Sequence, residues 1–458
     1  MEEPFGPSPD VELTEELAMA AVAADLARRP AGEKAAGRPS LWRHAEYMKI
    51  WTAATVSLMG SQVSQIALPF IAAVILNATP FEVSLLTTVD MLPFILFALP
   101  AGAWLDRMRR RPVLIAGDFG RAIALATIPV AYAAGMLTIW QLYAVGFAAG
   151  ILTVFFDVAD QSYLPVLLEP DDLVEGNAKL QISGSAAQIL GPGMGGGLIS
   201  IVAAPFAVLV DAASFVASGA LISLIRKSEP KPERRLGAEG RPTSLRHEIA
   251  EGLRYVLGNR YLRMIAGATG TSNLGSSMCF AIFPIFVYRE LGLSPALIGL
   301  TGSLAAFGVL LGAFTSAPLA RRFGVGPVIV GSMLINGPAM LLLVFLPSTA
   351  LAAGALLFGA LFGTGFSAVV YNVNQVSFRQ AITPLDMQGR MNATMRFIVW
   401  GTMPIGSLLG GVLATFIPLR TTVLIGAIVA TSAFLWLLFS PVRSLKTIPK
   451  TREAEAAG

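Results

Sequence analysis

The chain has 458 residues, of which 54% are hydrophobic and 14% carry a charge, whereas about 25% are charged in a typical soluble domain. This composition excludes a soluble globular protein and indicates a polytopic membrane protein. One cysteine excludes a disulfide framework, and two histidines leave little for a metal site. The net charge is +4 because basic residues are in excess. In a membrane protein these residues mainly set the orientation of the helices, so we expect no nucleic-acid partner.

Twelve apolar segments are each long enough to cross about 30 Å of hydrocarbon as a helix. The even number places both termini on one side. If that side is cytoplasmic, 30 of the 33 lysines and arginines face it, as the positive-inside rule requires. The predicted spans are residues 49–76, 83–105, 112–134, 138–161, 178–200, 204–226, 262–288, 294–319, 325–346, 349–375, 392–416 and 421–440.

The segments outside the spans set the predicted domain boundaries. The chain begins with acidic residues and has no signal-peptide core, so we expect a cytoplasmic tail with one short helix near 11–28. Between the sixth and seventh spans the composition changes to charge, proline and glycine, which is typical of a linker. Leucine, isoleucine and valine at helical spacing in this linker predict a short amphipathic helix along the inner membrane face. The predicted units are a tail at 1–41, a six-helix bundle at 42–226, the linker at 227–261, a second bundle at 262–441 and a tail at 442–458.

The two bundles are internal repeats, because residues recur after 215 positions. Further along the chain this offset drifts by two or three. Both halves hold six spans, so the repeats share one orientation and are related by an axis along the membrane normal. Transporter halves of this kind enclose a site near the midplane, which opens to either side by rocking. The recurring residues include Gly60 with Gly275, Pro69 with Pro284, Arg107 with Arg322 and Pro112 with Pro327.

A charged loop, "GAWLDRMRRR", follows the second span and contains the pattern G-x-x-x-D-R-x-x-R-R, with a degenerate copy, "ARRFGVGP", in the second half. The pattern closely resembles the signature loop of the major facilitator superfamily, and the resemblance covers residues 42–445. Within that superfamily the chain is most similar to bacterial enterobactin exporters and macrolide efflux proteins. The resemblance implies an all-α membrane protein with 12 transmembrane helices in two parallel-repeat six-helix bundles, which needs no cofactor.

The resemblance also implies a cytoplasmic gate in this loop. Asp106 can lie at the N-terminus of the eleventh span, where the helix dipole favours an anion. Arg107 and Arg110 can pair with acids of the third or fourth span, such as Asp157, and these pairs would break when the cytoplasmic side opens. The alternative is that the arginines only enforce topology. Arg109 stands where the family has glycine, which implies a left-handed backbone position that arginine disfavours.

The segment "GPGMGG" on the fifth span resembles the G-P-x-x-G-G element of proton-coupled exporters in the superfamily, and "PIGSLLGG" on the eleventh span answers it. Glycine lets helices approach closely and proline bends them. We therefore expect a tight, bendable contact between the halves, which favours export over uptake, although close packing alone is the alternative. The residues of this contact are Gly191, Pro192, Gly195 and Gly196.

Polar residues within the spans are the candidates for coupling and binding. Asp90 is the deepest acid of the first half, and such an acid costs about 2.5–3.5 kcal/mol on insertion scales and is usually functional. We expect Asp90 to carry the coupling proton, with a hydrated or structural acid as the alternative. Asp118 and Arg121 are spaced as a structural pair, and Asp211 stays unassigned. Amides near mid-membrane either orient a substrate or join helices, and they are Gln62, Gln65, Gln188 and Asn273.

These patterns predict a secondary transporter of the bacterial inner membrane, with both termini cytoplasmic and functional as a monomer. It would export an amphiphilic molecule, such as a drug, macrolide or siderophore, by proton antiport and alternating access. The alternatives are a uniporter, a nutrient symporter, a lysolipid flippase, or a transporter-like sensor that binds without flux. An enzyme is excluded because both histidines are cytoplasmic, Cys279 lies in an apolar stretch and no phosphate-binding loop is found.

Overall fold

The structure is a computed structural model and describes residues 41–105, 108–169, 172–227, 229, 245–384 and 387–446. All regular elements within these residues are helices. Eleven helical segments among them are long and apolar enough to cross a membrane. Another helix, α6 (Leu173–Ile201), is also 29 residues long, but its glycines, proline and polar residues make it less apolar. The predicted all-α fold of about twelve transmembrane helices is confirmed. The short helix predicted near 11–28 lies outside the described residues.

Each predicted span falls on one helix of the bundle. The first half contains α2 (Ala45–Phe70), α3 (Pro80–Leu105), α4 (Arg110–Ala133), α5 (Ile139–Leu167), α6 and α7 (Ala204–Ser223). The second half contains α9 (Arg260–Pro284), α10 (Pro295–Phe323), α11 (Val325–Leu341), α12 (Ala350–Ile382), α13 (Gln388–Phe416) and α14 (Leu419–Leu438).

Local sequence signals explain where these helices begin. Thr79 and Glu82 form a capping box at the start of α3, in which the Thr79 amide donates to Glu82 Oε2 at 2.7 Å and the Glu82 amide donates to Thr79 Oγ1 at 3.3 Å. Ser294 occupies the corresponding position before α10 and accepts a hydrogen bond from the Leu297 amide at 3.3 Å. A proline follows each cap at the first helical position, where its missing amide proton costs nothing.

The predicted repeat is visible in the helices themselves. α2 continues into a π-helical turn, η2 (Ile71–Ile75), and α9 continues into another, η4 (Ile285–Glu290). The start of η4 lies 214 residues after that of η2, close to the repeat offset. Each turn follows a helix that carries a proline near its C-terminus, which interrupts the regular hydrogen-bond ladder. The two turns contact one another, so the equivalent ends of the halves meet there. We call this side of the bundle the η2 end.

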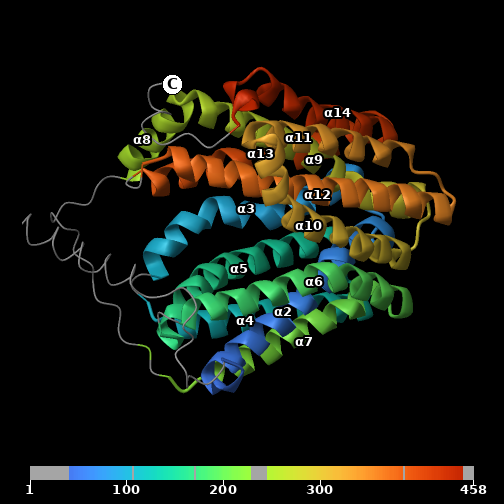
Figure 1. The fold of residues 1–458 in the computed structure, drawn as a ribbon. Helices are drawn as coiled ribbons and strands as arrows, with labels where there is room; N and C mark the ends of the chain where they lie inside the picture. The colour runs from blue at the N-terminus through green and yellow to red at the C-terminus, as the bar shows by residue number, and fades with distance from the viewer. Residues whose placement is uncertain are drawn as a thin grey trace, which may run out of the picture.

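Most of the contact between the two halves comes from two helix pairs. α6 of the first half lies against α10 of the second, and α3 of the first half lies against α13. Figure 1 shows the two groups of helices side by side, with α3 between α5 and α13. Each half also has its own packed interior, which includes Ile71 and Ile128 in the first half and Phe286 and Leu357 in the second.

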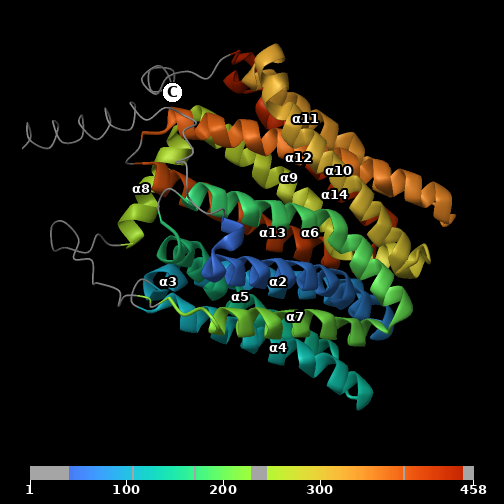
Figure 2. The same ribbon diagram turned by 60° about the horizontal axis from the view of Figure 1, so that its bottom comes forward.

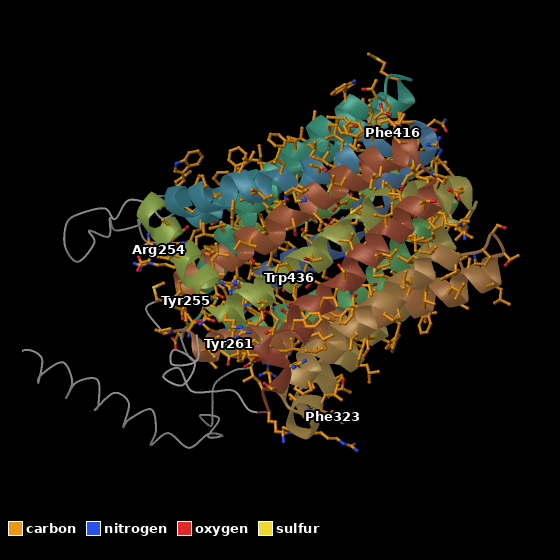
Figure 3. The ribbon with its side chains drawn as sticks, turned by 90° about the horizontal axis from the view of Figure 1, so that it is seen from above. Arg254, Tyr255, Tyr261, Phe323, Phe416 and Trp436 are labelled. Carbon is orange, nitrogen blue, oxygen red and sulfur yellow. The ribbon has the colours of Figure 1, made fainter. Side chains whose placement is uncertain are left out.

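The amphipathic helix predicted in the linker is present as α8 (Leu245–Gly258). It crosses the ends of the second half opposite the η2 end (Figure 2), and we call that side the α8 end. α8 is fixed to α13 because Glu251 pairs with Arg390 at 2.9 Å and Gly252 lies against Thr394. Figure 3 shows Arg254 of α8 at this end and Phe416 of α13 at the other.

The expectation that Arg109 has a left-handed backbone conformation is wrong. Its φ of −69° and ψ of 135° are extended, and the residue is the N-cap of α4. An N-cap residue has β-region backbone, which arginine adopts without strain. The loop therefore tolerates arginine here without a left-handed turn.

A first prediction concerns a close helix contact in the second half. A Cβ at Gly275 would lie 2.9 Å from Ala430 Cα of α14, whereas a Cβ at Gly331 of α11 would meet nothing within 4 Å. We expect Gly275→Ala to lower the stability by about 1–3 kcal/mol through overpacking. The matched change Gly331→Ala should be neutral or stabilising by up to about 1 kcal/mol. Thermal unfolding in detergent measures both, and equal melting temperatures would contradict this packing.

Candidate transport site

The glycine motif of α6 lies between two helices and uses different residues for each. Gly191 and Gly195 face α2 of the same half, where Gly191 leaves room for the side chain of Gln62. One residue further round the helix, Gly196 faces α10 of the other half, and a Cβ there would lie 3.1 Å from Gly299 Cα. The alternation follows from helical geometry, since positions i and i+4 share a face. The motif therefore joins the first half internally and also connects it to the second.

The contact between α6 and α10 extends beyond glycine packing. Pro192 lies against Gly299 and Gly302. The amide of Gly193 donates to Ser303 Oγ at 2.8 Å, and this bond crosses from one half to the other. A bond of this type is available because Pro192 distorts the helix next to it.

The second half repeats this arrangement on α13. Gly406 and Gly410 face α9 of their own half, and Gly411 faces α3 of the first half, beside Ser84. These three glycines lie 215 positions after Gly191, Gly195 and Gly196, so the offset does not drift here. The α6–α10 and α3–α13 contacts are thus equivalent parts of one two-fold seam.

Further contacts between the halves lie at the η2 end. Arg289 Nη1 of η4 donates to the carbonyl of Ala78 at 2.6 Å. The rings of Phe70 and Tyr288 meet edge to face with their centroids 5.0 Å apart. The glycine seam lies towards the same end, because Gly196 is near the last turn of α6 and Gly411 is near the last turn of α13. The halves are therefore closed together at the η2 end.

The α8 end differs, because opposite charges face each other there without pairing. Asp157 of α5 is exposed and lies within electrostatic range of Arg121 of its own half and, more weakly, of Arg396 on α13 of the other half. Asp157 forms no ion pair or hydrogen bond with any described residue, and Arg396 instead lies over the ring of Trp400 at 4.2 Å. Of the other predicted gate residues, Asp106 and Arg107 lie outside the described residues.

Arg110 has a partner that the sequence did not suggest. Its guanidinium pairs with Glu229 at 3.2 Å, and its amide donates to the same carboxylate at 2.8 and 2.9 Å. The Arg111 amide adds a bond of 3.1 Å to Glu229, whose side chain is 3% exposed. An anion is favoured at this position because it meets the free amides and positive dipole at the start of α4. The first residues after α7 are thereby fixed to the signature loop.

Asp90 lies about halfway along α3 and points towards α5. A Cβ at Gly146 of α5 would lie 3.9 Å from Asp90 Oδ1, so glycine provides the space for this carboxylate. The side chain is exposed, and it forms no hydrogen bond or ion pair with the described residues. Asp90 is thus an exposed carboxylate at a mid-helix position, unpaired among the described residues.

Asp118 and Arg121 form the structural pair that their spacing indicates. Asp118 Oδ1 lies 2.6 Å from Arg121 Nη2, and both side chains are buried. Arg121 also lies between the rings of Phe156 and Phe215, at 4.3 and 4.1 Å. The desolvated guanidinium is thus neutralised by an acid and covered by aromatic faces.

The four predicted amides have different environments. Gln65 and Gln188 are exposed, and each is free of hydrogen bonds to described residues. Gln62 fills the notch at Gly191, and Asn273 donates to the Val399 carbonyl of α13 at 3.1 Å. Asn273 therefore joins two helices, whereas Gln65 and Gln188 present exposed amides.

An open groove of about 590 Å³ lies elsewhere, between α4 and α5 near the η2 end. Its lining is apolar, with Ile123, Val130 and Met136 among the residues, and none of the predicted amides or acids contributes to it. Ile123 and Val130 are more than two-thirds exposed on the outside of the bundle. This groove is a feature of the outer surface and lies apart from the seam.

Comparisons with known proteins agree on a transporter. A family model described as transmembrane secretion effector matches residues 39–455. The multidrug efflux pump Tap of Mycolicibacterium fortuitum is 28% identical over 365 residues, which cover 76% of this chain and 84% of that protein. An uncharacterized MFS-type transporter of Bacillus subtilis, YfiS, is 23% identical over 390 residues, or 81% of this chain and 87% of its own length.

Solved structures share the fold. A mutant form of the nucleoside transporter NupG superposes with a TM-score of 0.67 at 12% identity, covering 86% of this chain and 99% of that one. A bacterial homologue of the lysosomal transporter Spinster, in an inward-facing and occupied conformation, superposes with a TM-score of 0.66 at 15% identity, covering 88% and 97%. Relatives and family are transporters and not enzymes.

A second prediction tests the seam. Gly196→Ala places a Cβ against the backbone of α10, whereas the neighbouring Gly197→Ala has nothing within 4 Å. We expect the first change to destabilise the closed η2 end by about 1–3 kcal/mol, which shifts the equilibrium towards the open state by roughly 5- to 150-fold. Cysteines placed at Phe70 and Tyr288 report closure through their cross-linking yield. The yield should fall with Gly196→Ala and not with Gly197→Ala, and an equal yield in both would refute the seam.

Proposed function

We propose, from the premise that the chain belongs to the transmembrane secretion effector family of the major facilitator superfamily, that it exports amphiphilic small molecules in exchange for protons. The observation that carries the proton coupling is Asp90. It is a carboxylate midway along α3, exposed and unpaired among the described residues, so it can gain and lose a proton without breaking another contact. An acid inside a membrane helix costs free energy on insertion, so such residues usually have a functional role.

Alternating access follows from the unequal ends of the bundle. The halves meet at the η2 end through the glycine seam, the Arg289 hydrogen bond and the ring pair. At the α8 end, Asp157 and Arg396 oppose one another from different halves. Rocking about the seam would bring these two charges together and open the η2 end, which is the motion by which parallel-repeat transporters expose a central site to either side.

The direction of export depends on the orientation in the membrane. The lysines and arginines gather at the α8 end and in the segments that leave it, so the positive-inside rule makes this end cytoplasmic. The structure would then be open to the cytoplasm, with both termini on that side of a bacterial inner membrane. The two bundles contain the whole seam, which supports a functional monomer.

The substrate class rests on the polar groups near the seam and on the similarity to a multidrug efflux pump. Gln65 and Gln188 are exposed amides, and amides can orient a polar group without demanding a charge. Large apolar side chains dominate the rest of the bundle, which suits an amphiphilic drug or siderophore better than a sugar. A symporter, a uniporter and a lysolipid flippase use the same fold, and a sensor would bind without flux.

The test uses inside-out vesicles with an acidic interior. Macrolides, siderophores, cationic dyes and lysolipids are added one at a time while the proton gradient is recorded. We expect one class to dissipate the gradient, and we expect Asp90→Asn to reduce this dissipation to the background of empty vesicles, because an amide cannot carry the proton.

Two variants control for folding. Asp90→Glu keeps an ionisable group and should retain part of the activity. Glu82→Gln lies on the same helix, in the capping box, and should leave the proton exchange in place with a small loss of stability. Normal dissipation by Asp90→Asn would exclude Asp90 as the carrier. Substrate-induced acidification of the interior would indicate symport instead of antiport.

A further inference from the structure

A second acid is buried in the first half, away from Asp90. Asp211 of α7 is 2% exposed. Ser61 of α2 donates to Asp211 Oδ1 at 3.3 Å, and Ser214 lies 3.2 Å from the same oxygen. Ser64 of α2 faces this carboxylate as well, is 7% exposed, and its buried hydroxyl has no other hydrogen-bond partner among the described residues. One carboxylate and three hydroxyls therefore converge near the middle of the α2 span.

A glycine of α2 provides the space in which this cluster forms. Gly60 of α2 lies directly against it, and a Cβ there would come within 2.9 Å of Asp211 Oδ1 and still closer to the side chain of Ser214. The absence of a side chain at Gly60 allows α2 and α7 to approach and brings the oxygens of both helices together.

The repeat in the second half provides an internal comparison. Adding 215 converts Gly60 into Gly275, Ser64 into Cys279 and Asp211 into Gly426. There, α9 and α14 pack directly, with Gly275 against Gly426 and Cys279 against Gly426. This helix contact is thus made in one half with no acid at all. Packing alone does not require Asp211, and an acid kept at this depth is costly.

The surrounding charges indicate which ligand would suit the cluster. Arg121 of α4 acts on Asp211, but it is paired with Asp118. No other described acid forms part of the cluster, so one negative charge is available. Carboxylate and hydroxyl oxygens are ligands for hard cations. A single charge in a buried site favours a monovalent cation, because a divalent ion would bring an uncompensated charge into low dielectric.

We propose that Asp211, Ser61, Ser64 and Ser214 form a binding site for Na⁺ between α2 and α7, distinct from Asp90. In this site the carboxylate neutralises the ion, and the three hydroxyls replace part of its water shell. Ser64, whose hydroxyl has no partner outside the cluster, would coordinate the ion through its oxygen. The proposal does not depend on export or on proton coupling, because binding to the resting protein is an equilibrium property.

The test measures binding of ²²Na⁺ to the purified full-length protein in detergent, with choline chloride keeping the ionic strength constant. We expect saturable binding that unlabelled Na⁺ displaces. Asp211→Asn should abolish it. Ser64→Ala should weaken it by about tenfold or more, since one ligand is lost.

The choice of Ser64 separates a site from a structural role, because its hydroxyl has no partner outside the cluster. Its removal should therefore shift the melting temperature little while Na⁺ binding falls. Ser218→Ala is the matched control. Ser218 is on α7 and is also buried, but its hydroxyl faces the neighbouring acid Asp118 and lies outside the cluster, so Na⁺ binding should be unchanged. The proposal is overturned if the wild type shows no saturable ²²Na⁺ binding, or if Ser64→Ala binds Na⁺ as the wild type does.

Discussion

The close backbone contact between glycines at the seam is the constraint on which the rest of the structure depends. Helices in a membrane gain no hydrophobic energy by associating, so they associate where small residues let their backbones touch. α6 and α13 each use two glycines to contact their own half and one to contact the other. A change in the angle between the halves must therefore involve these two helices, and charged groups that face each other from different halves, such as Asp157 and Arg396, change their separation when the halves tilt.

The two halves share a backbone plan but not a charge distribution. Glycines, prolines and π-helical turns recur after about 215 residues, because they set how helices approach and where they bend. The acids of the membrane helices do not recur in this way. The first half contains Asp90, the Asp118–Arg121 pair and Asp211, whereas the positions equivalent to Asp90 and Asp211 are Ala305 and Gly426. The acids on which both proposals rest therefore lie in the first half.

The sequence predicts the helices well because hydropathy and length are local properties, and capping pairs such as Thr79 with Glu82 mark where helices start. Tertiary partners are less predictable. Arg110 pairs with Glu229, which is 119 residues away in a segment that composition identifies only as a linker. The backbone at Arg109 followed from its N-cap position and not from the family's glycine. Asp211 was visible in the sequence, but the serines that surround it come from two helices, and only the packing at Gly60 brings them together.

Cys279 has a practical consequence. It is the single cysteine of the chain, it is 0% exposed, and its thiol donates to the Val423 carbonyl. Water-borne thiol reagents react with the exposed thiolate form, so this group is shielded from them in the folded protein. Cysteines introduced at the surface can then be modified selectively with fluorophores or spin labels in the otherwise native chain. The molecule is in this sense ready for spectroscopic distance measurements, and its motions can be followed without first replacing a residue of its interior.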